Sequence, residues 1–280
     1  MNLCMAAPWN LASKATDTVE NDPTRTSSIG GRRGTFQAAA SGAIPVLLLS
    51  VFAQFVINHR NVLPQVHHML KLDHITVIAP SLAEGVAHVR ACLDLDVPFG
   101  QRHDYMGTCN HLLQLGNSIY LEIVALDPAA DAPGRPRWFG LDDRKKVRSD
   151  WDSGRRLRGW VARTDAIDAI IADRRNIFGA KVPLPAVNSS FDFAIPDDGS
   201  LPLDGAAPSL IDRRGKPRSM ATIADLGARL RAFTLEHPDP GAVEALYRAL
   251  TVDRPPAIVR GQRLRYRAQI ETPAGMKELT

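Results

Sequence analysis

The residues of this sequence that could do chemistry are imidazole and carboxylate side chains in strand-like segments. His74 lies in the β-branched run LDHITVIAP, and Glu122 lies in the alternating run SIYLEIVAL. Because side chains alternate along a strand, His74 shares a face with Thr76, and Glu122 shares one with Tyr120. An imidazole and a carboxylate can ligate a divalent metal or transfer protons. The alternative is a core histidine and a half-buried carboxylate that is paired with another side chain.

Three further histidines and one cysteine lie in less specific surroundings. His111 stands in the middle of the expected strand NHLLQLG, where a core or rim histidine is common. His103 precedes Asp104 in an expected loop, where we expect exposure to solvent or a hydrogen bond that stabilises the loop. His237 in EHPDP fits local turn geometry. Cys109 has no expected base beside it on its strand face, so a buried, inert thiol is the simpler interpretation.

One stretch of the chain is locally basic. Arg135–Arg163 contains ten basic and four acidic residues in 29 positions. Such a stretch is most often a solvated charged loop. It also contains Trp138 and Phe139, which could form the wall of a ligand pocket or close one end of a barrel. Both interpretations stay open.

The composition is that of an ordinary globular chain. The 280 residues include 34 Lys and Arg against 30 Asp and Glu, and the excess drops to 29 against 27 over residues 69–280. Such a nearly neutral body, with no helix-turn-helix pattern and no aromatic-basic repeat, argues against a nucleic-acid partner. The three cysteines form no CxxC pair and are too few for a disulfide framework, so a reducing compartment is the default.

The first 68 residues differ from the rest. Residues 14–42 lack apolar periodicity and are expected to be disordered. The apolar stretch 43–57 would span only about 22 Å as a helix, against a hydrocarbon core of about 30 Å, which is too short for a typical transmembrane helix. We therefore expect residues 1–68 to be a dispensable extension of a cytoplasmic protein, whose physiological chain begins at Met69. The alternative is a signal peptide or membrane anchor formed by residues 43–57.

The residues from 72 onward predict alternating strands and helices. The first module, residues 72–128, contains a strand at 72–80 and a helix whose start is marked by Ser81 and Glu84 in a capping box. Strands are expected at 97–101, 110–116 and 118–126, which gives the order β-α-β-β-β.

The second half, residues 157–273, repeats the alternation. A strand at 160–162 precedes a helix with Asp165 at its N-cap, and strands follow at 191–196 and 208–213. Asp239 and Pro240 mark the start of a further helix, before a last strand at 263–273. We therefore predict an α+β fold of repeated βαβββ modules, in which curved, antiparallel-rich sheets surround a cavity and the helices lie outside.

Several separated segments resemble one known family. LDHITVIAPSLAEGV and MGTCNHLLQLGNSIYLEIVALDP resemble the first module of the vicinal-oxygen-chelate superfamily (glyoxalases, bleomycin-resistance proteins and dioxygenases). RPRWFGLD, LRGWVARTD, GSLPLDGAAPSLI and LEHPDP resemble the glyoxalase-like domain family more narrowly. The resemblance covers residues 72–273. It implies the fold more strongly than the reaction, because the superfamily includes isomerases, dioxygenases, lyases and ligand-sequestering proteins.

The resemblance implies a site built from the first and last strands of each module. His74 and Glu122 match the superfamily's inward-facing metal ligands, which would suit Zn, Mn, Fe or Ni. The corresponding positions of the second half align with Arg158 and Arg267, and arginine cannot ligate a metal. A third ligand would have to come from another histidine, for which His111 is the best candidate and His103 and His237 are the others.

The same resemblance suggests the kind of substrate. Arg158 and Arg267, if directed inward, would capture a carboxylate or phosphate, with Trp138 and Phe139 as pocket walls. We expect an enzyme of lyase, isomerase or dioxygenase type that acts on a small anionic metabolite, with His74 and Glu122 as its metal-binding or acid–base pair. The alternative is a non-catalytic module that binds or sequesters a small molecule. A homodimer is the one protein assembly that we consider, and a membrane partner is expected only if residues 43–57 are an anchor.

Overall fold

The computed structural model describes residues 69–216 and 218–280. The predicted N-terminal extension, residues 1–68, and its apolar stretch, residues 43–57, lie outside the described residues. The predicted start of the physiological chain at Met69 concerns these residues and stays a prediction. In the described ranges, no helix combines the length and the apolar character that crossing a membrane requires.

The first module has the predicted order β-α-β-β-β. Its elements are β1 (Leu70–Ile78), α2 (Leu82–Leu93), β2 (Phe99–His103), β3 (Thr108–Gln114) and β4 (Tyr120–Leu126). Ser81 caps α2 as predicted, because its Oγ accepts a hydrogen bond from the Glu84 backbone N–H at 3.3 Å and donates one to Oε2 of Glu84 at 2.7 Å. The capping box therefore fixes where the chain turns from β1 into the outer helix.

The second module repeats this order after a connecting segment. The segment contains η1 (Trp138–Gly140) and α3 (Arg144–Asp152). The module consists of β5 (Leu157–Thr164), α4 (Ile167–Ala172), α5 (Arg175–Phe178), β6 (Ala180–Leu184), β7 (Phe191–Ile195), η2 (Pro202–Gly205) and β8 (Ser209–Asp212). Ala166, not Asp165, occupies the N-cap of α4, so the predicted cap is off by one residue.

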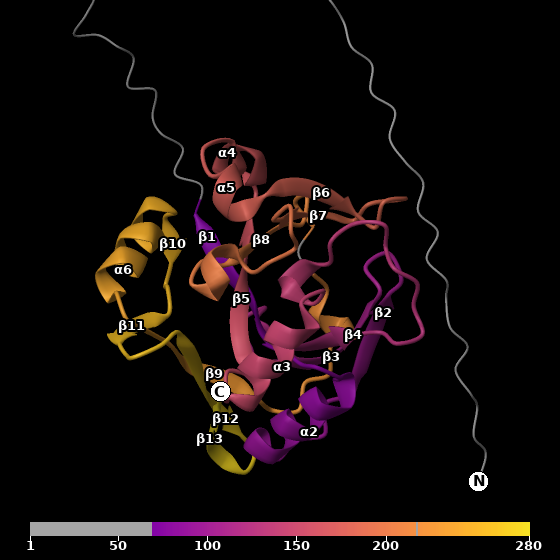
Figure 1. Cartoon of the computed structure of the whole chain (residues 1–280). Coiled ribbons are helices and arrows are strands. Elements are labelled where there is room, and N and C mark those ends of the chain that lie inside the picture. Colours follow the sequence, from indigo (N-terminus) through magenta and orange to yellow (C-terminus); the bar gives the residue numbers. More distant parts are fainter. Residues whose placement is uncertain (1–68, 217) are drawn as a thin grey trace, which may run out of the picture. The chain divides into compact units, whose positions relative to one another are not determined.

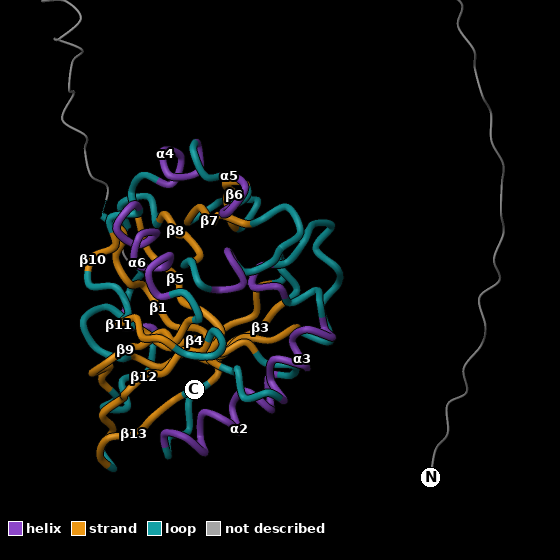
Figure 2. Tube along the Cα trace, turned by 60° about the vertical axis from the view of Figure 1, so that its left-hand side comes forward, coloured by secondary structure: helices purple, strands orange, loops and turns teal. Residues whose placement is uncertain are grey.

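Both modules contribute to one continuous sheet. Its strand order is β2-β3-β4-β1-β5-β8-β7-β6, and β1 and β5 pair antiparallel at its centre. On either side of this central pair, β4 runs parallel to β1 and β8 runs parallel to β5. The sheet curls and the helices lie at its periphery, as the two views show (Figures 1 and 2). The predicted α+β fold of βαβββ modules is therefore confirmed.

The remaining chain forms a second, smaller sheet. Its strands are β9 (Arg229–His237), β11 (Ala257–Arg260), β12 (Arg265–Thr272) and β13 (Gly275–Leu279). The same part of the chain contains η3 (Met220–Thr222), α6 (Pro240–Ala249) and the short β10 (Val252–Asp253), which pairs with β1 and so belongs to the long sheet. The strand order of the smaller sheet is β11-β9-β12-β13. Asp239 caps α6 as predicted, with its Oδ1 accepting from the Ala242 N–H at 3.1 Å. The strand expected at 263–273 is β12 of this second sheet. It is not the last strand of the second module, because β8 already completes that module.

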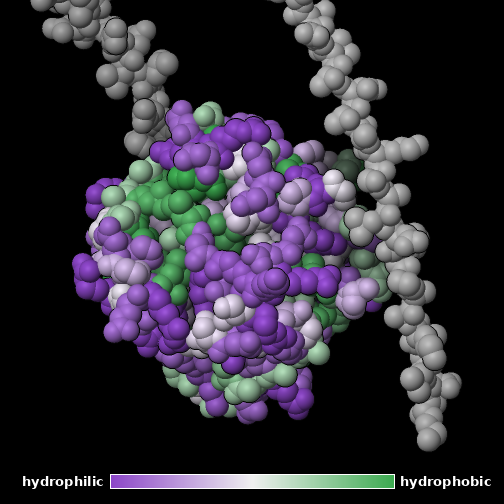
Figure 3. Space-filling model, viewed as in Figure 1, coloured by the Kyte–Doolittle hydropathy of each residue, from purple (hydrophilic) through white to green (hydrophobic). Residues whose placement is uncertain are grey.

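Two apolar clusters hold these layers together. The larger one packs α2, α6 and the second sheet against the long sheet and includes Trp160, Tyr247 and Tyr266. The smaller one contains Trp138, Phe139 and Phe193 on the other face of the long sheet, where the candidate site lies. Hydrophilic residues cover most of the face in Figure 3, and hydrophobic residues reach the surface between them, chiefly on the left of the view.

Candidate functional site

His74 and Asp73 occupy an irregularity in β1. The pairing of β1 with β5 shifts between Leu72 and His74, which leaves Asp73 as an extra residue in the strand, as in a β-bulge. Because of this shift, two consecutive side chains contact each other, and Nδ1 of His74 donates a hydrogen bond to Oδ1 of Asp73 at 2.8 Å. Both residues are buried. The carboxylate therefore orients the imidazole and leaves Nε2 directed away from Asp73.

Glu122 meets the other nitrogen of this imidazole. Its Oε2 lies 3.2 Å from Nε2 of His74, as an ion pair without the alignment of a good hydrogen bond. Its Oε1 accepts a hydrogen bond of 2.7 Å from Nδ2 of Asn110 on the neighbouring strand β3. The predicted convergence of His74 and Glu122 is thus present, and Asn110 holds the carboxylate in place.

The surroundings of the pair favour its charged form. Burial opposes charge on His74, but its contacts with Asp73 and Glu122 outweigh burial and raise its pKa above the ordinary value. Burial likewise opposes ionisation of Glu122, but the imidazolium of His74 and the amide of Asn110 lower its pKa to about 2. Both shifts favour a buried imidazolium in contact with a buried carboxylate.

Arg213 anchors this pair from the end of β8. Its Nε and Nη2 donate to Oδ2 and Oδ1 of Asp73 at 2.9 and 2.6 Å, and Nη2 also donates to the Tyr120 hydroxyl at 3.1 Å. The Tyr120 ring stacks on the His74 imidazole with centroids 4.5 Å apart. Bidentate guanidinium–carboxylate pairs combine strength with fixed geometry. Arg213 therefore links the second module to the imidazole of the first.

The walls of this pocket are largely aromatic. Trp138 and Phe139, predicted as wall residues, line it together with Phe193 and Ile211 from the second module. The pocket around His74 and Glu122 has a volume of ≈ 40 Å³, which is about the space of one or two waters. The structure thus places both aromatic residues at the pocket, and their role in binding a ligand remains a prediction.

His103 corrects the expectation of an exposed loop residue. It is the last residue of β2, is 4% exposed and lines the pocket. Its Nδ1 donates to the Thr108 hydroxyl at 3.1 Å, and its Nε2 accepts from the Gln101 amide at 2.8 Å. Burial lowers the pKa of His103, whereas the pKa of nearby His74 is raised, so the same pocket favours opposite protonation states of the two imidazoles.

His111 faces the opposite side of the sheet. It pairs with Ile123 on β4, whereas Glu122 pairs with Leu112, and its Nδ1 donates to the Val97 carbonyl at 2.7 Å. Because side chains alternate, His111 cannot reach the site, and the prediction of a third ligand there is wrong.

Two other residues behave as the sequence indicated. Nδ1 of His237 accepts a hydrogen bond from the Asp239 backbone N–H at 3.0 Å, which is local turn geometry. Burial raises the pKa of the Cys109 thiol, which makes it a poor nucleophile.

Neither predicted anion-binding arginine lies in the pocket. Arg158 is fully buried on β5, where its Nη2 pairs with Oδ2 of Asp150 at 2.8 Å. Arg267 lies on β12 in the second sheet, is 43% exposed and pairs with Glu236. The expected alignment fails for Arg267 because it took β12 as the last strand of the second module, and it fails for Arg158 because the strand register places Val161, not Arg158, opposite His74.

The strand register identifies other residues at the corresponding positions. At the centre of the sheet, His74 of β1 pairs with Val161 of β5. In the first module, His74 also pairs with Tyr120 of β4. In the second module, Val161 pairs in the same way with Ser209 of β8. Two residues after Tyr120 stands Glu122, and two residues after Ser209 stands Ile211. The second-module counterparts of His74 and Glu122 are therefore Val161 and Ile211, which are apolar.

This donor set does not fit a resident divalent metal. Only His74 and Glu122 converge, and both nitrogens of nearby His103 already have partners. Across residues 69–216 and 218–280, no three His, Cys, Asp or Glu side chains form a group that could hold a metal ion. Stable protein sites usually provide three or four ligands. The pair is therefore better suited to proton transfer than to metal binding.

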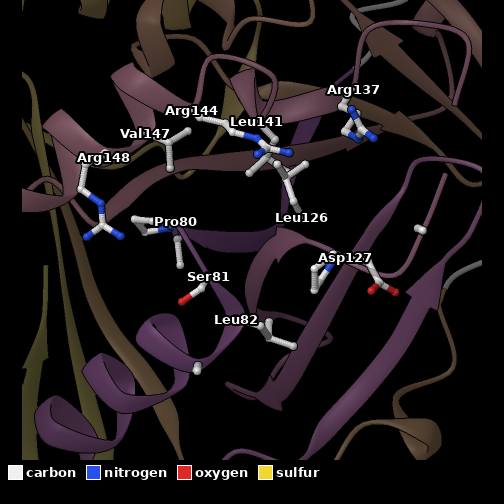
Figure 4. Close-up of a pocket in the computed structure, with 14 residues that line it drawn as sticks. Pro80, Ser81, Leu82, Leu126, Asp127, Arg137, Leu141, Arg144, Val147 and Arg148 are labelled. Atoms are coloured by element: carbon white, nitrogen blue, oxygen red, sulfur yellow. The ribbon is translucent and has the colours of Figure 1, made fainter. Parts of the chain in front are cut away.

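The basic stretch Arg135–Arg163 lines a different pocket. This pocket, of ≈ 590 Å³, lies at the start of α2, with Arg137, Arg144 and Arg148 along one side (Figure 4). Arg137 pairs with Asp142 at 2.6 Å, and Arg148 pairs with Glu84 at 2.7 Å. Much of the local basic charge is thus neutralised by neighbouring carboxylates.

Three residues of the site were not expected from the sequence, namely Asp73, Asn110 and Arg213. Tyr120 was expected only to share a strand face with Glu122. Asp73 adjoins His74, but regular alternation assigns it to the opposite face. Arg213 ends the segment PSLIDR, and only the parallel pairing of β8 with β5 brings that end toward β1.

Comparison with known proteins identifies the fold family. Residues 72–251 match the family described as glyoxalase-like domain. No protein among the curated sequences matches. A solved structure of a hypothetical protein from Staphylococcus aureus is similar, with 12% identity and a TM-score of 0.48, over 73% of this chain and 91% of that one.

Methylmalonyl-CoA epimerases are also among the similar solved structures. The Mycobacterium tuberculosis enzyme has 16% identity and a TM-score of 0.33, over 58% of this chain and 97% of its own. A variant of the Streptomyces coelicolor enzyme in complex with 2-nitronate-propionyl-CoA has 17% identity and a TM-score of 0.33, over 54% of this chain and 99% of its own.

Proposed function

Because the chain belongs to the glyoxalase-like domain family, we propose that it is an enzyme that transfers a proton on a small anionic metabolite. His74 and Glu122 form its acid–base pair. The observation that carries this proposal is the contact of 3.2 Å between Nε2 of His74 and Oε2 of Glu122 in a buried pocket. Side chains with pKa values shifted in opposite directions by one environment are typical of acid–base sites.

The two groups have complementary roles. The Glu122 carboxylate accepts a proton from a carbon next to a substrate carbonyl, and the C–H electron pair moves to the carbonyl oxygen. The Nε2–H of His74 donates a hydrogen bond to this oxygen as its negative charge develops. Return of the proton from Glu122 to this carbon, with the electron pair moving back from the oxygen, closes the cycle. Return to the same face exchanges the hydrogen with solvent, and an epimerisation requires the enolate to turn its other face to Glu122 before the proton returns.

Substrate binding would increase the basicity of Glu122. Its low pKa depends first on the nearby imidazolium of His74. When a substrate oxygen takes the Nε2–H of His74, this ion pair weakens and the pKa of Glu122 rises toward that of an ordinary carboxylate. A base works best when its pKa approaches the operating pH, so the substrate itself would activate Glu122.

Three neighbours serve as positioning residues. Asp73 holds Nδ1 of His74 protonated, and Asn110 fixes the rotation of the Glu122 carboxylate. Arg213 holds Asp73 and so keeps the imidazole oriented. A site held by such hydrogen bonds does not have to reorganise during the reaction.

Exchange of substrate hydrogen with solvent tests this proposal. Proton NMR in D₂O would follow deuterium incorporation next to the carbonyl in a panel of 2-oxo and 3-oxo carboxylates and their phosphate-bearing analogues. We expect accelerated exchange for at least one compound and a loss of about 10²–10⁴-fold in Glu122→Gln. Glu271→Gln is the matched control, because Glu271 is exposed and pairs with Arg231 on the second sheet.

A different result would support the non-catalytic alternative. If compounds of the panel bind but none exchanges faster than in buffer, the acid–base proposal fails. The small pocket with its apolar second-module wall would then be a binding site for a sequestered ligand.

A further inference from the structure

A basic vestibule adjoins the His74–Glu122 pocket. It has a volume of ≈ 610 Å³, within the range of small-molecule sites. Five cationic side chains line it, and none of its lining residues is Asp or Glu. The five are Arg102, Arg213, Arg214, Lys216 and Arg218, and we call the cavity that they line the basic vestibule.

Three of the five cations form ion pairs with carboxylates that do not line the vestibule. Arg102 pairs with Asp127, Arg213 with Asp73, and Arg214 with Asp192. Their contribution to the field in the vestibule is therefore partly cancelled.

The other two cations have no carboxylate partner among the described residues. Lys216 is exposed. The guanidinium of Arg218 lies over the Tyr120 ring at 5.3 Å, and its buried Nε has no hydrogen-bond partner. Cation–π contact holds the Arg218 guanidinium in place without neutralising it. The vestibule thus carries two uncompensated positive charges.

The vestibule and the pocket are neighbours that share lining residues. Both are lined by Gln101, Phe191, Arg213 and Arg218. Arg218 therefore stands at the junction, next to the ring that stacks on His74. Ser189 and Ser190 also line the vestibule.

We propose that the basic vestibule, through Lys216 and Arg218, binds a phosphoryl group of a substrate whose reacting end lies between His74 and Glu122. A phosphate monoester carries a charge of about −2 near neutral pH and several acceptor oxygens, which matches the two unpaired cations. The pocket itself is too small for such a group. This inference deepens the proposed function and rests on it for the position of the reacting end.

The larger pocket at the start of α2 is a weaker candidate for the same role. Its Arg137 and Arg148 have carboxylate partners, and Asp127 itself lines it. A dianion there would meet a carboxylate, whereas the vestibule presents none.

Calorimetric titration of the full chain at about pH 8 tests the inference. The probes are inorganic phosphate, glycerol 3-phosphate as a phosphate ester, and propionate as a carboxylate control. We expect both phosphates to bind and Lys216→Ala/Arg218→Ala to weaken them at least tenfold. Lys181→Ala/Arg231→Ala is the matched control, because it removes the same charge from exposed ion pairs elsewhere. Circular dichroism would verify that both double variants are folded.

The outcomes separate this inference from the proposed function. Tighter binding of glycerol 3-phosphate than of inorganic phosphate would indicate an esterified ligand, and equal binding would indicate free phosphate; both support the site. Absence of phosphate binding, equal binding of propionate, or unchanged affinity in Lys216→Ala/Arg218→Ala would overturn it. Phosphate binding that is unchanged in Glu122→Gln, together with no hydrogen exchange in any compound, would reject only the acid–base function.

Discussion

The two modules of the long sheet have the same topology but different chemistry. In the first module, His74 and Glu122 face the pocket, and in the second the corresponding positions are Val161 and Ile211. Phe193 and Ile211 of the second module form an apolar wall opposite the charged pair. The first module therefore carries the reactive groups, and the second reduces their contact with water, which strengthens their electrostatic interaction.

Two adjacent arginines form ion pairs that differ in their exposure to solvent: Arg213 pairs with Asp73 of the first module, and Arg214 pairs with Asp192 of the second. Arg213 and Asp73 have side chains that are 12% and 3% exposed, whereas Arg214 and Asp192 are 41% and 10% exposed. Removing one partner of a buried ion pair leaves an uncompensated charge, while an exposed arginine regains water. The same carboxylate-to-amide change should therefore cost more in the first module.

The largest effect is expected for Asp73→Asn. This change should lower the free energy of unfolding by about 3–5 kcal/mol, because Arg213 and His74 would both lose a buried anion. Urea denaturation at neutral pH measures it. A loss below about 1 kcal/mol, the level of an exposed ion pair, would show that the bulge does not depend on this carboxylate.

Asp192→Asn is the matched change in the second module. It should cost about 1 kcal/mol or less, because Arg214 is partly exposed and its guanidinium can be hydrated. If urea denaturation gives equal losses for both variants, the proposed difference between the modules is wrong.

A smaller effect is expected for Phe193→Leu in the pocket wall. The side chain contacts Trp138 and Phe139, with ring centroids 5.5 and 5.7 Å apart. Its shortening should cost about 1 kcal/mol in urea denaturation. It should shift the pKa of His74 much less than Glu122→Gln does, because it changes the hydration of the imidazole but removes no charged group. A His74 pKa shift as large as that in Glu122→Gln would contradict the assignment of this wall to solvent exclusion alone.

The sequence predicted the fold better than the site. The capping box at Ser81, the turn into α6 at Asp239 and the order of the first module follow from local residue patterns. The convergence of His74 and Glu122 was implied by family resemblance. These features depend on short-range geometry or on a motif that the chain preserves.

The rest depends on long-range pairing. Asp73 reaches His74 only because of a bulge, and Arg213 reaches Asp73 only because β8 lies beside β5. The alignment that places Arg158 and Arg267 in the site is wrong, because Val161 corresponds to His74 and because β8, not β12, completes the module. Spacing along the chain contains no information about which strand joins which sheet.

The protonation state of His74 tests the central claim most directly. NMR of ¹⁵N-labelled imidazole should show both nitrogens protonated at pH 7, with a pKa above 6.5, and a lower pKa in Glu122→Gln because a neutral amide no longer stabilises the imidazolium. A raised pKa also means that the imidazolium stabilises the fold fully below pH 6.5, and that this contribution is lost as the pH rises through the His74 pKa. A neutral His74 at pH 7, or a titration that Glu122→Gln leaves unchanged, would contradict the buried ion pair at the centre of the proposed site.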